Sequence, residues 1–316
     1  MNNLEISLVV PILNEEPIID ELARRSMLAL ESISLHCELI IVDDGSTDGS
    51  LAGLKAHHAR DPRIRYISLS RNFGHQMAIT AGLDTARGNV VVIMDGDLQD
   101  PPELIPELYQ KYLDGAQVVY AKRRVRLKEP TWKRWTARTF YRMLRSITHI
   151  DIPMDTGDFR LVSRKVLVNL GEMRERDRFL RGQIAWLGFR QESVLYDRPG
   201  RTTGEPKYTV RKSVGLALSG IFSFSSLPLR MVSFFGLIVS FIAFCIILYA
   251  LWSKLIRGDV ISGWTSLIIS TMFIGGVQLL SLGVIGEYLN RINMEVRKRP
   301  MYVVDRSSEN NNLEPS

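Results

Sequence analysis

Short apolar runs alternate with stretches of mixed polarity over the first 120 residues of the chain. Apolar and β-branched side chains dominate residues 4–13, 38–42, 64–69, 90–94 and 116–121. Runs of this length predict buried strands, and the stretches between them are long enough for helices. Strands that alternate with helices predict an α/β domain built on a mostly parallel sheet with helices on both faces.

The hydrophobic pattern changes in the last third of the chain. Residues 231–253 and 260–286 contain no charged side chain, and each run is longer than the ~20 apolar residues needed to cross a bilayer. We therefore predict two transmembrane helices, over residues 229–253 and 260–287.

These patterns divide the chain into successive parts. Residues 1–210 are the predicted α/β domain, 211–228 a juxtamembrane amphipathic segment, and 288–316 a basic tail that is expected to be disordered after Asp305. Within the first part, residues 131–148 carry aromatic and cationic side chains at helical spacing. That pattern predicts a basic helix in the lipid headgroup region. A helix that binds RNA is the alternative, and the two apolar segments that follow argue against it.

Charge and cysteine content add to this picture. The formal net charge of +6 suits a nucleic acid or an anionic membrane surface. We predict a membrane and no nucleic acid. Cys37 and Cys245 are the two cysteines, and the second lies inside an apolar segment, so a disulfide framework is not expected. The first strand begins almost at Met1, so we expect no cleavable signal peptide. Cations after the second apolar segment outnumber those in the link, which predicts a multi-pass protein of the inner (plasma) membrane with a cytoplasmic catalytic domain and C-terminus.

The apolar run at 90–94 ends at two aspartates separated by one glycine. Side chains alternate along an extended chain, so Asp95 and Asp97 are expected on the same side. Gly96 between them leaves the backbone open to a ligand. Two hard oxygen donors suit a divalent cation, Mg²⁺ or Mn²⁺, that carries a diphosphate. A turn with two solvated aspartates is the structural alternative.

Polar residues also follow the first two predicted strands. Pro11, Asn14 and Glu15 come at the end of the first, and Asp43 and Asp44 at the end of the second. Ligands of parallel sheets bind outside the carboxyl ends of the strands, so these residues are expected at the same edge as the two aspartates above. The turn after the first strand lacks the G-x-G-x-x-G of a dinucleotide-binding fold, and the chain lacks a P-loop.

Four segments in order carry a resemblance to a known family: "VVPILNEE", "IVDDGSTDGS", "SRNFGHQMAITAGLDTARG" and "VIMDGDLQDPPELIPEL". They resemble the family 2 glycosyltransferases of GT-A fold, and within them the polyprenyl-phosphate glycosyltransferases, which include dolichyl-phosphate mannose synthase and bactoprenol glucosyltransferases. The resemblance extends over essentially the whole chain.

The resemblance implies roles for the residues at the sheet edge. Asp43 or Asp44 would accept a hydrogen bond from the uracil N3–H, Arg123 would bind phosphate, and Asp97 would act in catalysis through the cation. The implied donor-binding set is Pro11, Asn14, Glu15, Asp43, Asp44, Asp95, Gly96, Gln99 and Arg123, and the implied metal ligands are Asp95 and Asp97.

The same resemblance implies an acceptor site. The segment Gly157–Leu161 contains Asp158, which the family uses as the favoured general base. The sequence leaves open whether Asp158 is a base or an electrostatic positioner, and an ion pair with Arg160 is the structural alternative. Arg181, Arg201 and Lys207 would bind the acceptor phosphate.

The predicted reaction is an inverting transfer of a hexose, glucose, from a UDP-sugar to undecaprenyl (polyprenyl) phosphate. The framework would equally serve mannose, N-acetylhexosamine or aminoarabinose donors. A non-catalytic membrane scaffold that binds nucleotide sugars is the alternative from another class. With two predicted spans per chain, small residues in the spans favour a homo-oligomer, for instance a tetramer.

Overall fold

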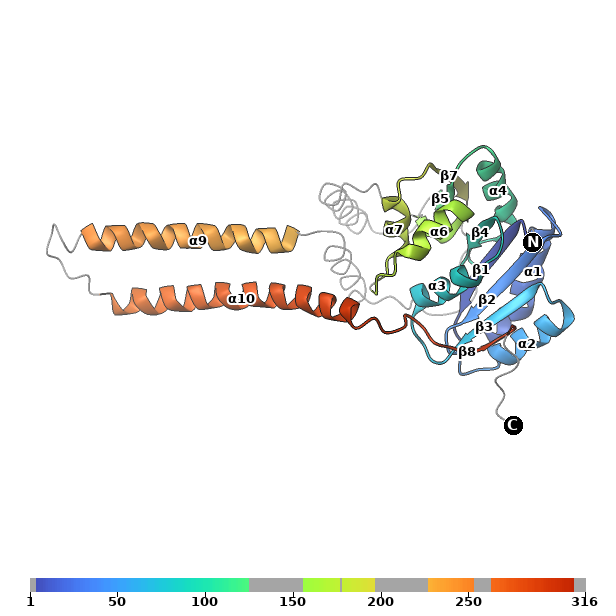
Figure 1. Ribbon diagram of the computed structural model, residues 1–316, viewed down its shortest axis with the longest axis horizontal. Coiled ribbons are helices and arrows are strands. Elements are labelled where there is room, and N and C mark those ends of the chain that lie inside the picture. Colours follow the sequence, from blue (N-terminus) through green and yellow to red (C-terminus); the bar gives the residue numbers. More distant parts are fainter. Residues whose placement is uncertain (1–3, 125–155, 177, 197–226, 253–262, 310–316) are drawn as a thin grey trace. The chain divides into compact units, whose positions relative to one another are not determined.

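The computed structural model describes residues 4–124, 156–176, 178–196, 227–252 and 263–309 (Figure 1). The chain divides into two compact units. One comprises residues 1–207 together with 299–316, and the other comprises residues 208–298. The predicted basic helix at 131–148 and most of the juxtamembrane segment at 211–228 lie outside the described residues.

The first unit is built on an eight-stranded sheet with the order β7-β5-β6-β4-β1-β2-β3-β8. Strands β1 to β4 are parallel to one another, while β6 is antiparallel to both β4 and β5, and β8 is antiparallel to β3. The predicted, mostly parallel α/β sheet is therefore confirmed. The strands are β1 (Ile6–Ile12), β2 (Cys37–Asp43), β3 (Ile64–Leu69), β4 (Val90–Ile93), β5 (Val118–Arg123), β6 (Thr156–Ser163), β7 (Gln191–Tyr196) and β8 (Val304–Ser307).

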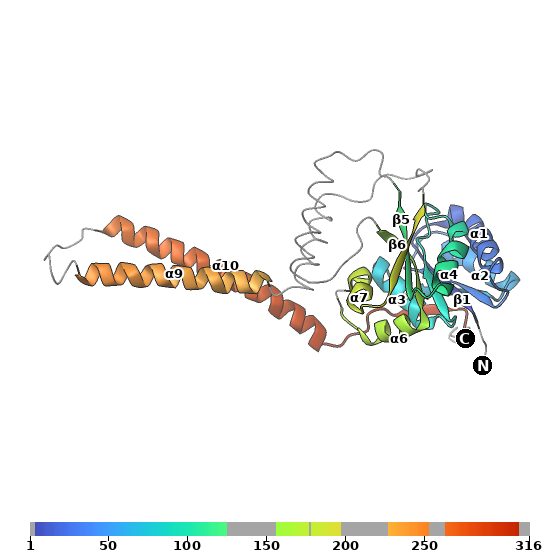
Figure 2. The same ribbon diagram turned by 90° about the horizontal axis from the view of Figure 1, so that it is seen from above.

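Helices cover both faces of this sheet, as Figure 2 shows. Alternate residues of β1 face opposite cores: Leu8 and Val10 pack with α1, α2 and α4, and Val9 packs with α3, α6 and α7. This alternation is the period of two expected of a strand buried on both faces. The helices are η1 (Glu16–Ile18), α1 (Ile19–Glu31), α2 (Ser50–Arg60), α3 (His75–Thr85), η2 (Pro102–Leu104), α4 (Ile105–Leu113), α6 (Arg164–Glu172) and α7 (Leu180–Trp186).

The C-terminal segment adds the edge strand β8 to the sheet. The backbone N–H of Ser70 donates to Val303 O at 2.9 Å, and that of Ser308 donates to Tyr66 O at 3.0 Å. Just beyond β8, the carboxylate of Glu309 pairs with Arg65 and Arg87. Disorder was predicted after Asp305, and this prediction is therefore wrong for residues 306–309. Without this strand β3 would be an unpaired edge, and its free backbone groups provide the hydrogen bonds that order the tail.

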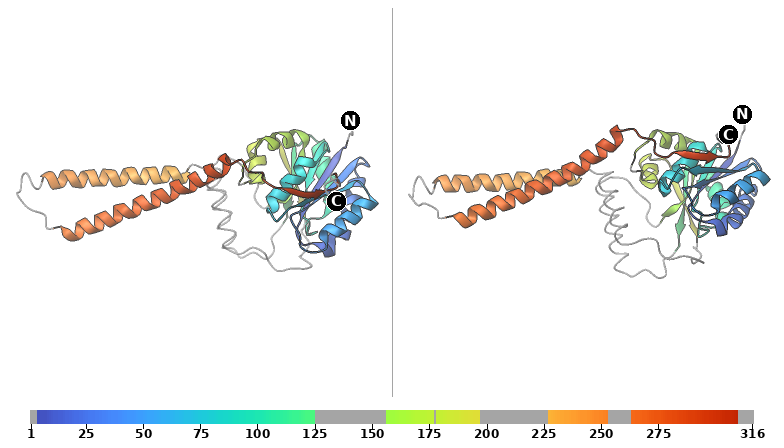
Figure 3. Two further views of the ribbon diagram at one scale, coloured as in Figure 1. Left: turned by 60° about the horizontal axis from the view of Figure 1, so that its bottom comes forward. Right: turned by 90° about the horizontal axis from the view of Figure 1, so that it is seen from below.

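The second unit contains α9 (Leu227–Trp252) and α10 (Trp264–Val296), which pack against each other (Figure 3). The second helix runs nine residues beyond the predicted limit of 287. Among the residues that the structure describes, no helix combines the length and the hydropathy required to cross a bilayer. The two predicted spans are thus unconfirmed.

Candidate active site

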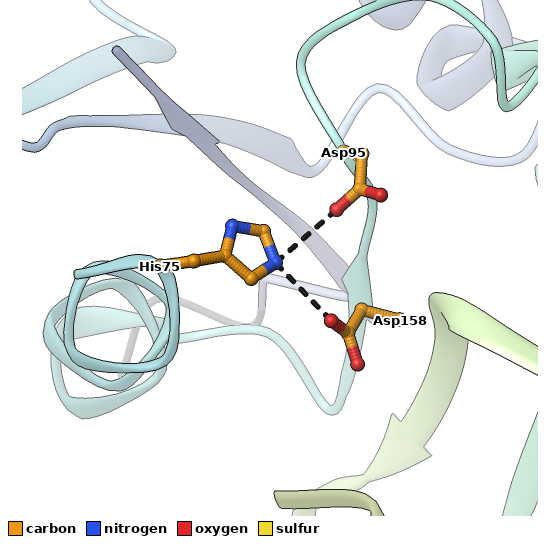
Figure 4. A group of neighbouring side chains, drawn as sticks. All are labelled: His75, Asp95 and Asp158. Atoms are coloured by element: carbon orange, nitrogen blue, oxygen red, sulfur yellow. Dashed lines mark hydrogen bonds and ion pairs between the residues drawn. The ribbon is translucent and has the colours of Figure 1, made fainter. Parts of the chain in front are cut away.

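Two carboxylates from neighbouring antiparallel strands face each other at one edge of the sheet. In the β4–β6 register, Ile93 is paired with Arg160. Asp95 follows Ile93 by two residues and Asp158 precedes Arg160 by two, so the same register brings both to the carboxyl end of β4. The imidazole of His75, from the start of α3, lies between them (Figure 4). Its Nε2 is 3.3 Å from Asp95 Oδ1 and 3.1 Å from Asp158 Oδ2.

Both oxygens of Asp158 are engaged by other side chains. Arg181 Nε donates to Oδ1 at 2.7 Å, and Gln76 Nε2 donates to Oδ2 at 3.3 Å, the same oxygen that His75 contacts. Arg160 Nη2 is 3.8 Å from Oδ1. Burial alone would raise the pKa of this carboxyl, but the hydrogen bond from His75 and the charge of Arg181 outweigh it and hold the pKa well below its usual range. Asp158 is therefore a fixed anion and a weak base.

His75 carries the positive charge between Asp95 and Asp158. Desolvation would lower its pKa, but the hydrogen bond between its ring and Asp158, together with the charges of Asp158 and of Asp95 at 3.3 Å, raises the pKa to about 10. The loop before it is held by Asp44, whose carboxylate accepts the backbone N–H groups of Phe73 and Gly74. Gly74 has a φ of +100°, a conformation that favours glycine, and α3 begins directly after it.

His75 and Gln76 are site residues that the sequence reasoning did not identify. They stand in the segment "SRNFGHQMAITAGLDTARG", where they are the polar residues that open α3 after the loop following β3. Two polar side chains at the start of a helix that follows a parallel strand were the available signal, since such helices begin at the ligand-binding edge of the sheet.

The first aspartate of the D-G-D motif offers an oxygen suited to a cation. Asp95 Oδ1 is buried and accepts no hydrogen bond from the described residues, although it lies 3.3 Å from His75 Nε2. A buried carboxylate oxygen without a hydrogen bond is costly in isolation and favourable as a metal ligand. The second aspartate closes a tight turn, in which Asp97 Oδ1 accepts the backbone N–H of Gln99 at 3.1 Å and Leu98 adopts a φ of +54°. The donor set fits Mg²⁺ or Mn²⁺.

Gly96 is required for packing against β1. A Cβ at this position would lie 2.7 Å from Ile12 Cγ2 and 2.9 Å from the carbonyl oxygen of Pro11. The structure thus gives a packing reason for this glycine, and its predicted role in ligand approach stays a prediction. The same contact places Pro11 beside the two motif aspartates.

Asp43 and Asp44, at the end of β2, organise the neighbouring loops. Asp43 accepts from the backbone N–H of Ser46 at 2.9 Å and from Ser68 Oγ at 3.0 Å. Both carboxylates are almost fully buried, and burial raises the pKa of Asp44. Contact of either residue with a nucleobase stays a prediction.

Asn14 and Glu15 join the loop after β1 to the loop after β2. Asn14 has a φ of +55°, its amide oxygen accepts the backbone N–H of Thr47 at 2.8 Å, and its own N–H donates to Ser46 Oγ at 2.9 Å. The backbone N–H of Glu15 donates to Ser50 Oγ at 3.2 Å. These hydrogen bonds hold the two loops together next to Asp95 and Asp97. Direct donor contacts from Asn14 and Glu15 stay predictions.

Three predicted phosphate-binding residues receive no structural account. Arg123 is the last residue of β5, and its side chain lies outside the described part of the chain. Arg201 and Lys207 also lie outside the described residues.

Comparison with known proteins identifies the family. The model of "Glycosyl transferase family 2" matches residues 7–171, which contain β2 to β6, all but the first residue of β1, and most of the site described above. The chain belongs to this family. It is therefore a glycosyltransferase, and the predicted resemblance is confirmed.

Relatives of this glycosyltransferase match over nearly their whole length. An SfII prophage-derived bactoprenol glucosyl transferase from Shigella flexneri is 40% identical over 311 residues, which cover 98% of this chain and 100% of the relative. A prophage bactoprenol glucosyl transferase homolog from Escherichia coli is 39% identical over 303 residues, covering 96% and 99%. An uncharacterized glycosyltransferase of Bacillus subtilis, YkcC, is 45% identical over 305 residues, covering 96% and 94%.

Solved structures are more distant. Glucosyl-3-phosphoglycerate synthase from Mycobacterium tuberculosis, in complex with Mn²⁺, uridine-diphosphate and phosphoglyceric acid, has a TM-score of 0.48 and 21% sequence identity. The alignment covers 69% of this chain and 76% of that chain.

Proposed function

We propose that this glycosyltransferase transfers glucose from UDP-glucose to a polyprenyl phosphate, undecaprenyl phosphate, with inversion at the anomeric carbon. The observation that carries the proposal is the state of Asp158, whose two carboxylate oxygens are bound by Arg181, His75 and Gln76.

This arrangement suits a phosphate acceptor better than a hydroxyl acceptor. A hydroxyl group must lose its proton to a base during attack, and efficient general bases have a pKa near the working pH. The pKa of Asp158 is held far below that range. A phosphate oxygen is already anionic and needs no base. We therefore propose that Asp158 positions His75 and Arg181 and does not act as the base.

Arg181 is the side chain best placed to attract the acceptor phosphate. Its Nε is fixed by Asp158 at 2.7 Å, and about a third of the side chain is exposed. A guanidinium held at a defined angle favours phosphate because its planar donors match the phosphate oxygens. A second arginine, Arg160, is buried beside the same carboxylate and adds positive charge.

The proposed reaction uses these placements. An oxygen of the lipid phosphate attacks the anomeric carbon from the face opposite UDP, and the bond from that carbon to the diphosphate oxygen breaks. The electron pair of that bond leaves with UDP, so the product is a β-linked polyprenyl-phosphate glucose. A divalent cation held by Asp95 and Asp97 would supply charge neutralisation at the departing diphosphate. Gln99, whose backbone closes the turn at Asp97, is proposed as a contact of the donor.

The identities of sugar and acceptor are supported by the relatives named bactoprenol glucosyl transferase, which match over almost all of both chains. The same site chemistry would serve mannose, N-acetylhexosamine or aminoarabinose donors.

We also propose attachment to the cytoplasmic face of a membrane through residues 208–298. The support is the apolar surface of α9 and α10, where large side chains such as Phe241 and Leu279 are about two-thirds exposed. An apolar surface of this kind is unfavourable in water and marks a lipid or protein contact. Sedimentation of the protein with membranes after carbonate washing is the expected result, and recovery in the supernatant would contradict it.

The experiment that tests the reaction uses the full chain in detergent with Mn²⁺, undecaprenyl phosphate and a panel of nucleotide sugars. We expect a lipid product with the mass of polyprenyl-phosphate hexose, formed from UDP-glucose and absent for Asp97→Ala. The matched control is His57→Ala, because His57 pairs with Asp20 on the helical surface away from the site. UDP-glucose binding without any lipid product would instead support the scaffold alternative.

A further inference from the structure

His75 lies between the carboxylate assigned to the cation and the carboxylate on the acceptor side. Figure 4 shows its ring pointing from the start of α3 toward both Asp95 and Asp158, with the same nitrogen facing the two carboxylates. That nitrogen, Nε2, is 3.3 Å from Asp95 Oδ1 and 3.1 Å from Asp158 Oδ2. The proposed reaction gives this residue no task.

The contacts define what Nε2 can do. A ring nitrogen that faces two carboxylate oxygens must carry a hydrogen, because its lone pair would otherwise be directed at two anions. A nitrogen that carries a hydrogen cannot also coordinate a metal ion. His75 therefore takes the place in front of Asp95 Oδ1, the buried oxygen that accepts no hydrogen bond from the described residues.

A metal ion shared by all three side chains would be poorly placed. The ligand atoms of His75, Asp95 and Asp158 lie within 4.8 Å of one another, which is close enough for one ion. However, Asp158 is already paired with Arg181 at 2.7 Å and lies 3.8 Å from Arg160. An ion bound to Asp158 would lie beside two guanidinium groups, whose charges repel it. The cation is therefore favoured on the side of Asp95, where His75 is its competitor.

We propose that His75 holds Asp95 in the ligand-free enzyme and is displaced from it when a divalent cation binds, which leaves the Nε2 hydrogen to Asp158 alone. The inference rests on the proposed function, which assigns Asp95 and Asp97 to the cation. In this proposal His75 is a positioning residue that couples the donor side of the site to the acceptor side. The cation and the donor bind at Asp95. The imidazole that they displace then binds Asp158 more strongly on the acceptor side. Such coupling acts in both directions.

The test is direct Mn²⁺ binding to the full chain in detergent, measured by loss of the free-ion electron paramagnetic resonance signal with and without UDP. Because His75 competes for Asp95, His75→Ala is expected to bind Mn²⁺ about tenfold more tightly, within the usual range of coupling between sites. His57→Ala is the matched control and is expected to bind as the unchanged protein does. His75→Gln keeps a neutral donor and much of the volume, and is expected to tighten binding at least about threefold. His75→Gln can replace His75→Ala in the test if the alanine variant does not fold.

The outcomes separate this proposal from the proposed function. Weaker Mn²⁺ binding by the His75 variants would make His75 a metal ligand, and unchanged binding would remove the competition; either result overturns the proposal. Neither result contradicts the proposed function as long as Asp97→Ala no longer binds Mn²⁺. Mn²⁺ binding by Asp97→Ala equal to that of the unchanged protein would overturn the cation assignment and the competition together.

Discussion

Arg181 Nε donates a hydrogen bond of 2.7 Å to Asp158 Oδ1, which ties helix α7 to strand β6. Gln76 completes the connection from α3: its Nε2 donates to Asp158 Oδ2 at 3.3 Å, and its Oε1 accepts the backbone N–H of Leu180 at 3.3 Å. Three elements that are distant in sequence are thereby fixed around one carboxylate. These contacts hold the three elements together around Asp158.

Removing the charge of Asp158 tests its role as a positioner. Asp158→Asn leaves Arg181 and His75 without their common anion, and we expect kcat to fall by about 100-fold or more, the usual loss when a preorganised polar group is removed. Steady-state kinetics with UDP-glucose and lipid phosphate measure the loss. Asp84→Asn is a suitable control, because Asp84 pairs with Arg174 on the surface. Activity of Asp158→Asn equal to that of the unchanged enzyme would contradict the role.

The pH dependence of the reaction provides a second test of the same residue. Since the pKa of Asp158 lies well below its usual value, the carboxylate stays ionised from mildly acidic to alkaline pH, and the stability it contributes is lost only as pH falls through that low folded-state pKa. An increase of kcat/KM with pH near pH 6 is expected from the second ionisation of the acceptor phosphate, which has a pKa of about 6. Asp158→Asn should retain this increase at its lower rate. Disappearance of the increase in that variant would identify Asp158 as the base.

Gly96→Ala tests the contact between the D-G-D turn and β1. The added Cβ would lie 2.7 Å from Ile12 Cγ2 and 2.9 Å from the Pro11 carbonyl, so the turn must shift. We expect the free energy of unfolding to fall by about 1–3 kcal/mol and activity to fall by up to about 100-fold as the aspartates move. Thermal unfolding and kinetics measure both effects.

Gly171→Ala is the matched control for this substitution. Gly171 lies near the end of α6, and an added Cβ there would meet no atom within 4 Å. Alanine should be neutral or stabilise by up to about 1 kcal/mol, because glycine is a poor helix former. Equal destabilisation by the two substitutions would argue against a specific packing requirement at Gly96.

The C-terminal strand is expected to stabilise the catalytic unit. Glu309 pairs with Arg65, which is itself buried against Glu38 at 2.5 Å. Glu309→Ala should therefore lower the free energy of unfolding by about 1 kcal/mol, or the melting temperature by about 2–4 °C for a unit of this size. Differential scanning calorimetry measures the change. Asp305→Ala, in β8 itself, removes an exposed carboxylate and should change the melting temperature little, and a larger effect from it would contradict the assignment.

Much of the fold was predictable because it depends on local pattern. The five predicted strands were found with boundaries within two residues, since short apolar runs between turns leave few alternatives to a buried strand. The β4 turn with Asp95 and Asp97 was predictable for the same reason. Strand β6, by contrast, was not predicted, because the charged site residues Asp158 and Arg160 interrupt the apolar pattern within it.

The order of the strands decided what local pattern could not. The sequence by itself determined an α/β sheet and the family-like motifs at its carboxyl edge, because these depend on residues close together in the chain. Only the tertiary structure decided that β6 enters antiparallel between β4 and β5, which brings Asp158 opposite Asp95 and places His75 between them. The same holds for β8, whose exposed polar residues predict no strand until the free edge of β3 supplies partners for its backbone. Contacts between distant segments depend on register and strand order, and the hydrophobic periodicity of a single segment determines neither.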